Sequence, residues 1–474
     1  MARPDTVVGL TVELIRRRGV PRWAFAVAAT SVVALGALAV GRGCPATTSA
    51  RVTREWAEWS AAPLDGEAID VDPAVVATAS GWLVAWSRWE RGRGPAVLVA
   101  SLGRDGILRG RAQVLSAPGT FARRPALARD GARVAVAWTA RDEGDREWNP
   151  RPWLAVIDAD AKVLVPARRV GGDAGFGYRV SVASDGQGWG LGWTALARDF
   201  HGVVLARLSP EGEPRGPFTR TPMEENGGDS ELAWVGDAWI LPVVVHDYER
   251  DRSALRVMWF DQGGRLVESR RVAPSRGQAG ALRVAARAST AWVTSAEDSA
   301  FGVRHDPRLV AFEGRRVVAG PVALGPRRSG DVSSLACAAT DCVSAWVGVP
   351  EEGDPPPILH ARVLDAAGVP RGDERRIGPG ATLSQLGSAA VARSIDERET
   401  LAVWTRYTSP RGLLMAVRLG PDGAPLAPPV ALSLPARAVV AAFDRRAGRA
   451  PRDRALTRRR TRPMPQQTAP RGTP

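Results

Sequence analysis

Residues 125–140 read PALARDGARVAVAWTA, and this stretch decides the fold. It contains a short apolar segment, a turn at Asp130-Gly131 and a run of small and apolar residues that includes Trp138. Asp-Gly between two apolar segments is typical of a β-hairpin. An uninterrupted apolar run indicates a strand that is covered on both faces. The stretch therefore predicts two paired strands inside a larger antiparallel sheet.

The next residues complete a four-stranded unit. A charged loop at 141–152 leads to WLAVID, and a turn at Asp158–Lys162 leads to VLVPARRV. Related segments begin at Pro73 and Ser334, and the second strands recur roughly every fifty residues, seven times in all. Several short strands at this period predict an all-β chain, a seven-bladed β-propeller of four-stranded antiparallel blades over residues 61–434.

Tryptophans mark the second strand of most copies. They stand at Trp86, Trp138, Trp193, Trp346 and Trp404, and we expect them to pack between adjacent blades. In the fourth and fifth copies the Trp is displaced, to Trp239 and Trp292, so the sequence defines the bounds of those blades less sharply.

The repeat also resembles a known kind of protein. The segments PAVVA at 73–77 and LVAW at 83–86, followed in other copies by a segment similar to ARLDPDG, are similar to the repeat of uncharacterised secreted or membrane-anchored bacterial seven-bladed β-propeller proteins. The resemblance covers roughly residues 70–432. It implies the fold and no particular reaction.

The N-terminal residues predict export. Residues 1–22 form a basic cytoplasmic segment, and residues 23–41 form a transmembrane or signal segment. Its eighteen uncharged residues, 23–40, would rise about 27 Å in a helix, close to the thickness of the bilayer core. The arginines before it favour a cytoplasmic N-terminus, with the propeller on the periplasmic or extracellular side of a bacterial inner membrane.

Two alternatives remain open at this end. Ala37-Leu38-Ala39 fits a signal-peptide cleavage site, after which the protein would be secreted. Cys44 follows and could carry a lipid, although Gly41 and Arg42 depart from the usual lipobox pattern. Residues 42–60 are a linker and a possible ring-closing strand.

The charge of the chain lies at its ends. Residues 1–43 carry a net +4 and residues 437–474 a net +9, which leaves the body of this +14 chain near +1. A nucleic-acid reader should carry a basic stripe on its folded surface, so we expect no nucleic-acid partner. The tail at 435–474 is basic and nearly free of apolar residues, which predicts disorder.

The loops after the second strands are long and charged, and variable loops on a rigid repeat commonly carry recognition. All four histidines lie in or beside these loops, but in four successive blades, so we expect no metal site. The candidate ligand-binding residues are Trp89, Trp148, Phe200, His201, His246, Tyr248 and His305.

Cys337 and Cys342 flank the turn AATD of the sixth copy. Opposite positions of a hairpin bring Cβ atoms within about 4.5–5.5 Å, so we predict a disulfide between them. The alternative is a pair of small buried thiols. An oxidising compartment outside the cytoplasm favours the bridge.

No catalytic motif is present in the sequence: HExxH, GxSxG, the Walker loop and GxGxxG are all absent. We therefore interpret the chain as a monomeric, non-catalytic binding or scaffold module for a protein or cell-envelope ligand, with no catalytic residue and no cofactor. The alternative is a secreted polysaccharide hydrolase or lyase. Two or three carboxylates and Arg that converge at the mouth of the central channel would favour the enzyme, and a loop face with scattered charges would exclude it.

Overall fold

A computed structural model describes residues 68–432, apart from 91–92, 143–148, 173–175, 198, 248–251, 275–278, 299–304, 326–332, 349–357, 380–388 and 409–410. The chain divides into two units, Met1–Leu64 and Asp65–Pro474, and all described residues lie in the second. The segments 1–22, 23–41 and 42–60 and the tail 435–474 lie outside the described residues. The described part contains no helix of sufficient length and apolarity to span a bilayer.

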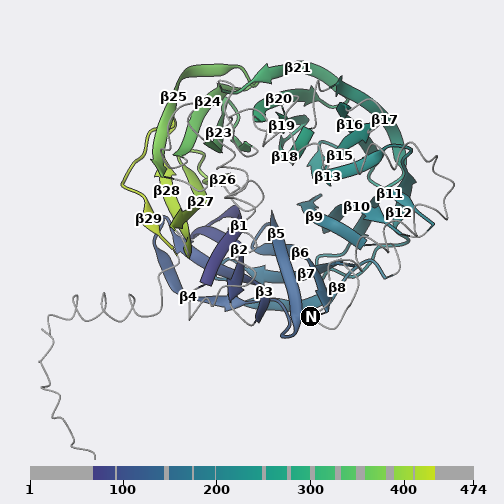
Figure 1. Cartoon of the computed structure of the whole chain (residues 1–474), viewed down its shortest axis with the longest axis horizontal. Helices are drawn as coiled ribbons and strands as arrows, with labels where there is room; N and C mark the ends of the chain where they lie inside the picture. Colours follow the sequence, from purple (N-terminus) through teal and green to yellow (C-terminus); the bar gives the residue numbers. More distant parts are fainter. Residues whose placement is uncertain are drawn as a thin grey trace, which may run out of the picture. The chain divides into compact units, whose positions relative to one another are not determined.

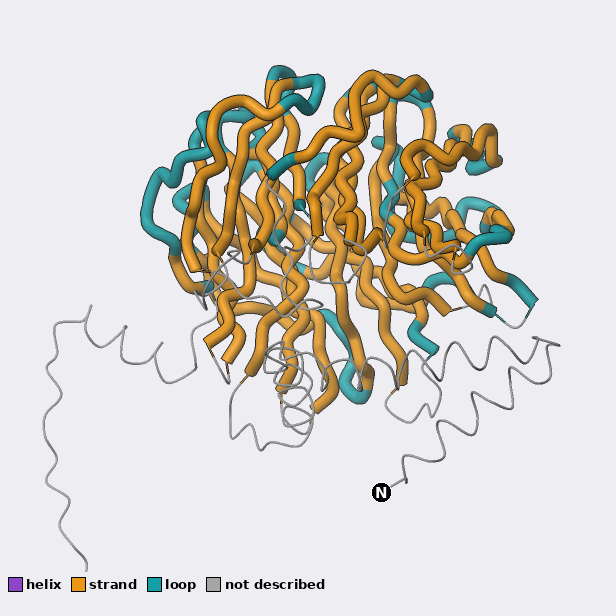
Figure 2. Tube along the Cα trace, turned by 45° about the horizontal axis from the view of Figure 1, so that its top comes forward, coloured by secondary structure: helices purple, strands orange, loops and turns teal. Residues whose placement is uncertain are grey.

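The described residues form a β-propeller whose sheets stand around a ring (Figures 1 and 2). Five sheets are separate blades of four or five strands. The first two comprise β5 (Thr120–Asp130), β6 (Arg133–Asp142), β7 (Arg151–Asp158) and β8 (Val163–Arg169), then β9 (Phe176–Ser184), β10 (Trp189–Leu196), β11 (His201–Leu208) and β12 (Thr219–Pro222). The third comprises β13 (Asn226–Ser230), β14 (Ala233–Val235), β15 (Ala238–Asp247), β16 (Arg252–Asp261) and β17 (Leu266–Pro274). The last two comprise β18 (Ala279–Arg287), β19 (Thr290–Asp298), β20 (His305–Glu313) and β21 (Arg316–Ala323), then β22 (Ser334–Cys337), β23 (Asp341–Gly348), β24 (Ile358–Asp365) and β25 (Pro370–Pro379).

The remaining strands form a single eight-stranded sheet that joins the two ends of the ring. It comprises β26 (Ala390–Arg393), β27 (Thr400–Thr408), β28 (Arg411–Leu419), β29 (Val430–Ala431), β1 (Ala68–Thr78), β2 (Gly81–Glu90), β3 (Arg93–Gly103) and β4 (Leu108–Val114). Its pairs are antiparallel except for one parallel bridge between Ile69 on β1 and Gly412 on β28.

The prediction of four-stranded antiparallel units is confirmed, but the prediction of seven separate blades is wrong. The structure has five separate blades, because β1 approaches β28 closely enough to make the first and last units one continuous sheet. Sequence periodicity counts repeats and carries no information on this pairing.

The core lies between neighbouring sheets. Trp138 on β6 is fully buried and packs in one cluster with Leu83 and Val99 of the preceding sheet. The predicted second-strand tryptophans are all 3% exposed or less, and Trp239 and Trp292 are buried as well. Truncation of such a residue to Ala typically costs about 3–5 kcal/mol. The recurrent tryptophans therefore form part of the hydrophobic core between sheets and are not a binding surface.

Side-chain hydroxyl groups link successive units near their inner strands. The Ser87 hydroxyl accepts a hydrogen bond from the Arg124 backbone N–H at 2.9 Å. Thr194 donates to the carbonyl of Gly228 at 2.8 Å. Thr405 donates to the carbonyl of Asp70 at 3.1 Å and so connects the last unit to the first. A buried hydroxyl beside an inner strand thus ties each of these units to the next.

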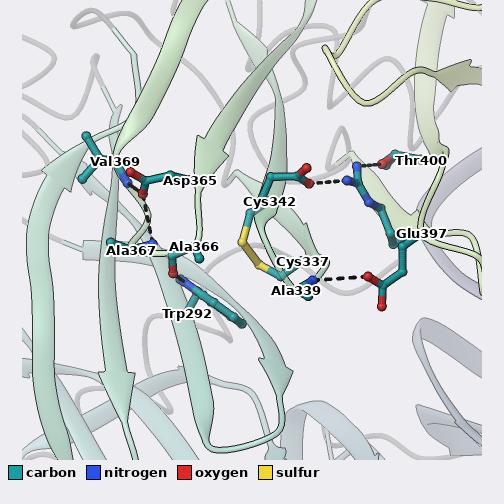
Figure 3. The surroundings of a disulfide bond; sticks show 12 residues. Trp292, Cys337, Ala339, Cys342, Asp365, Ala366, Ala367, Val369, Glu397 and Thr400 are labelled. Carbon is teal, nitrogen blue, oxygen red and sulfur yellow. Dashed lines mark hydrogen bonds and ion pairs between the residues drawn. A yellow bond between two sulfur atoms is a disulfide. The ribbon is translucent and has the colours of Figure 1, made fainter.

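Cys337 and Cys342 form a disulfide at the end of the β22–β23 hairpin, where they are directly opposite each other (Figure 3). The S–S distance is 2.08 Å and the Cα–Cα distance is 4.0 Å. The Ala339 backbone N–H, in the turn between the two cysteines, donates to Glu397 at 3.3 Å. The bridge therefore closes a hairpin turn that also contacts the neighbouring unit.

Candidate functional site

Five inner strands carry an irregular step in their pairing with the next strand, at the centre of the ring (Figure 1). The steps lie between Val71 and Ala74 on β1, Arg123 and Ala126 on β5, Gly177 and Val180 on β9, Gly227 and Ser230 on β13, and Ala279 and Leu282 on β18. Bulges of this kind redirect side chains and are frequent beside active sites. Four of the five hold a charged residue: Asp72, Arg124, Arg179 and Asp229.

Two of these residues have strained backbones. Asp72 has a φ of 52° and Arg124 a φ of 55°, which is the left-handed region that non-glycine residues seldom adopt. Each left-handed backbone conformation lowers the stability of the fold by roughly 1–2 kcal/mol. Proline follows both, at Pro73 and Pro125, so neither bulge can continue the hydrogen-bond ladder at that point. Strain of this kind clusters at functional sites.

Glu231 lies at a break in the inner strand of the unit that also carries Asp229, between β13 and β14. Pro242 of β15 stands opposite this break and has no N–H to donate, which explains the interruption. The Glu231 backbone N–H donates to the Pro242 carbonyl at 3.3 Å. One carboxylate oxygen of Glu231, Oε2, is buried and has no hydrogen-bond partner in the described part of the chain.

Charged groups from several units interact at these inner positions. Arg179 Nη1 lies 3.4 Å from Asp229 Oδ2, and the two side chains are 16% and 21% exposed. The Ser87 hydroxyl donates to Asp72 Oδ2 at 3.3 Å while it accepts from Arg124. The charge of Arg283, on β18, acts on Asp72, Asp229 and Glu231 alike. The cluster thus joins residues from β1, β5, β9, β13 and β18.

The surroundings drive the pKa values of the three carboxyl groups apart. Burial raises the pKa of Glu231, although Arg283 and Arg179 act against it. Burial also raises the pKa of Asp72, against the charge of Arg124. At Asp229, burial is outweighed by the charges of Arg179, Arg124 and Arg283, and the pKa is lowered. When the pKa of one carboxyl group is raised and that of its neighbour is lowered, the first can act as an acid and the second as a base in the same site.

The loop residues that the sequence singled out lie elsewhere. Trp89 is half-buried at the end of β2, and its indole N–H is buried with no partner among the described residues. Phe200 packs against a core cluster, and the guanidinium of Arg220 lies 4.2 Å from its ring centre. Trp148, Tyr248 and the side chain of His305 are outside the described residues. Ligand binding by these residues stays a prediction.

Two histidines lie against the bulge that holds Asp229. His201 Nε2 accepts a hydrogen bond from the Gly227 N–H at 3.2 Å, and burial lowers its pKa. His246 Nδ1 is 2.8 Å from the Ser253 hydroxyl, and burial lowers its pKa although Asp229 acts against this. The structure therefore places both beside the inner cluster, as packing around its backbone. His360, in contrast, is buried in another unit, 2.5 Å from Glu374 and stacked on Trp346.

Sequence analysis did not identify the inner cluster. Its signal is a charged residue in the bulge of the first strand of four units, three of which read Asp72-Pro73-Ala74, Arg124-Pro125-Ala126 and Arg179-Val180-Ser181. These charges are recognisable only when the repeats are aligned, because each belongs to a separate blade. Within the ranges that the structure describes, no group of three metal-ligating side chains is positioned to hold a metal ion.

Neither a protein-family model nor a curated protein sequence matches the chain. Solved structures do. A prolyl endopeptidase matches with a TM-score of 0.46 and 16% identity, over 89% of this chain and 56% of that one. The β-propeller domain of the Trilobed protease from Pyrococcus furiosus matches with a TM-score of 0.46 and 12% identity, over 78% of this chain and 99% of that one.

A sialidase from Trypanosoma rangeli, in complex with the inhibitor DANA, matches with a TM-score of 0.40 and 10% identity, over 80% of this chain and 57% of that one. This chain therefore spans little more than half the length of the endopeptidase and of the sialidase. Similarity at these identities concerns the β-propeller fold alone.

The interpretation as a non-catalytic binding or scaffold module is corrected by the residues of the inner strands. Asp72, Asp229 and Glu231 share their surroundings with Arg124, Arg179 and Arg283. Carboxylates and arginines that converge on inner strands meet the criterion set for the enzyme, and the charges of a simple binding face would be scattered.

Proposed function

We propose that the protein is a polysaccharide hydrolase whose active site is the inner cluster. The observation that carries the proposal is the contrast between Asp229, whose pKa is lowered, and Glu231, whose pKa is raised, in one arginine-rich site. Glycoside hydrolysis uses two carboxyl groups in these two states. The buried, unpartnered Oε2 of Glu231 is the oxygen that holds the transferable proton.

The roles follow from the protonation states. Glu231 donates its proton to the glycosidic oxygen as the bond from that oxygen to the anomeric carbon breaks. A water molecule bonds to the anomeric carbon on the opposite face, and Asp229 accepts the proton that this water loses. The electron pair of the broken bond stays on the leaving oxygen, so charge and protons balance.

In the steps above, water displaces the leaving group directly and no covalent intermediate forms with the protein, which inverts the configuration at the anomeric carbon. We therefore expect the first product to have the opposite anomeric configuration to the substrate, which NMR of the fresh product measures.

The test is release of reducing ends from a panel of neutral and acidic polysaccharides by the purified full-length protein. Asp229→Asn and Glu231→Gln should each lower kcat by about 10²–10⁴-fold, since each removes one proton-transfer group. Asp160→Asn is the matched control, because Asp160 is exposed in the turn between β7 and β8. Absence of activity on every polysaccharide, or activity that survives both site substitutions, would refute the proposal.

We also propose that the enzyme works outside the cytoplasm. The apolar segment 23–41 and the Cys337–Cys342 disulfide support export, because structural disulfides persist in oxidising compartments. Fractionation of the producing cells tests this. Recovery of the intact chain in the cytoplasm, with both cysteines reduced, would contradict it.

A further inference from the structure

The inner cluster holds three arginines, Arg124, Arg179 and Arg283, but the structure shows only one ion pair among its described residues. Arg179 is paired with Asp229. Among the residues that the structure describes, neither Arg124 nor Arg283 forms an ion pair, and the one hydrogen bond of the Arg283 side chain goes to the carbonyl of its neighbour Leu282. Two guanidinium groups on the inner strands therefore have no ion-pair partner among the described residues.

In the described part of the chain, neither Asp72 nor Glu231 lies close enough to Arg124 or Arg283 to form an ion pair. Burial raises the pKa of both Asp72 and Glu231, so that each keeps its proton to a higher pH than an exposed carboxyl group. Burial also lowers the pKa of Arg283 to about 10, which still leaves this side chain charged in neutral solution. Holding a cation in such surroundings is costly unless an anion joins it.

The two arginines without an ion pair among the described residues both interact electrostatically with Asp229. The charges of Arg124 and Arg283, from β5 and β18, both lower the pKa of Asp229 on β13. The backbone at Arg124 is strained, so its side chain is held at this position at the expense of stability. A planar guanidinium forms paired hydrogen bonds with a carboxylate, which makes Arg the residue best suited to bind that group.

We propose that the substrate of this site is a carboxylated glycan, such as a chain of uronic acids, whose carboxylate binds between Arg124 and Arg283. The inference rests on the proposed hydrolase function of the same cluster. A substrate carboxylate supplies the missing counter-ion, and it places the neighbouring glycosidic bond beside Asp229 and Glu231. A neutral glycan would leave both half-buried guanidinium groups without an anionic partner, so it should bind more weakly.

Binding is tested with the full chain carrying Asp229→Asn and Glu231→Gln, which should bind without turnover. Calorimetric titration with a galacturonic acid oligosaccharide is compared with titration of its methyl ester, which has the same sugars without the charge. We expect the acid to bind about 10–100-fold more tightly, the usual effect of hydrogen bonds to charged groups. The affinity should fall as salt is added. Equal affinity for acid and ester would overturn the inference.

Substitution then assigns the binding to the two arginines. Arg124→Gln and Arg283→Gln should each abolish most of the preference for the acid, and Arg124→Lys should keep part of it because the charge remains. Arg265→Gln is the matched control, since Arg265 is 86% exposed in the turn between β16 and β17. A preference for the acid that persists in both Gln variants would overturn the assignment. If a Gln variant does not fold by circular dichroism, the comparison of acid with ester in the parent chain still decides.

The two proposals fail separately. If the acid binds preferentially but the parent enzyme releases no reducing ends from it, the hydrolase is refuted and the carboxylate site stands. If neutral polysaccharides are hydrolysed as fast as acidic ones, the carboxylate site is refuted and the hydrolase stands. An unsaturated product from the uronate would indicate elimination, which refutes hydrolysis and still supports the carboxylate site.

Discussion

Arg179 on β9 and Asp229 on β13 form an ion pair between the inner strands of adjacent blades, with 3.4 Å between Nη1 and Oδ2. Both residues stand in bulges at corresponding places of their units. The pair therefore orients a carboxylate at the centre of the ring and joins two blades at the same time. Loss of either partner should affect stability as well as the proposed chemistry.

Arg179→Ala should lower the free energy of unfolding by about 2 kcal/mol at neutral pH, because it leaves Asp229 half-buried without its partner. The pKa of Asp229 is lowered in the folded chain, so its contribution to stability is present above pH 3.8 and is lost as the pH falls through the folded pKa. Urea unfolding at pH 7 and pH 3 measures both effects, and the gap between variant and parent should narrow at pH 3.

Arg265→Ala provides the comparison for this measurement. Arg265 pairs with Asp261, but the two side chains are 86% and 36% exposed. An exposed pair contributes about 0–1 kcal/mol. If Arg265→Ala destabilised the protein as much as Arg179→Ala does, the inner pair would have no special role in joining the blades.

Activity should be confined to the pH range between the lowered pKa of Asp229 and the raised pKa of Glu231. Glu231 must be protonated, and activity should fall as the pH rises through its raised pKa, above the ordinary 4.5. Asp229 must be ionised, and activity should fall only as the pH drops through its lowered pKa, below 3.8. The measurement is kcat/KM against pH with an acidic polysaccharide. A profile with its maximum above pH 9 would contradict the assignment of Glu231 as the acid.

The pH dependence of stability tests the raised pKa of Glu231 independently of activity. The folded chain holds the Glu231 proton more tightly than the unfolded chain, so this residue destabilises the fold progressively as the pH rises from about 4.5 through its folded pKa. In Glu231→Gln this loss should disappear. Thermal unfolding of parent and variant between pH 4 and pH 8 should therefore diverge with pH, and parallel curves would show that Glu231 is ionised throughout.

The sequence predicted the repeat and its strands because hairpin turns and apolar runs are local signals. The turn at Asp130-Gly131 and the buried Trp138 both follow from neighbours within a few residues. The bridge between Ile69 and Gly412 could not be predicted, since it joins residues at opposite ends of the propeller. The site was missed for the same reason. Asp72 and Arg283 are coupled only when the ring is closed.

The hydrogen bond that connects the last unit to the first gives a further testable prediction. Thr405→Val should destabilise the protein by about 1–3 kcal/mol, because the carbonyl of Asp70 loses its buried hydrogen-bond donor between the last and first units. Thr194→Val, which removes the corresponding bond to Gly228 inside the ring, should cost about the same. Chemical unfolding of both variants measures this. Thr120→Val is the control, since the Thr120 bond to Ala117 is exposed, and an equal loss there would contradict the argument.

The disulfide gives the last prediction. Intact-mass spectrometry of protein purified from the cell envelope without reductant should show Cys337 linked to Cys342, which leaves Cys44 as the one remaining cysteine of the chain. The bridge closes a loop of only a few residues, so the double variant Cys337→Ser, Cys342→Ser should lose only about 2 kcal/mol. Reductant should destabilise the parent protein by a similar amount and leave the double variant unchanged, which separates loss of the bridge from loss of packing by the buried Cys342. Free thiols at both positions in envelope-derived protein would contradict the bridge, and with it one of the two supports for export.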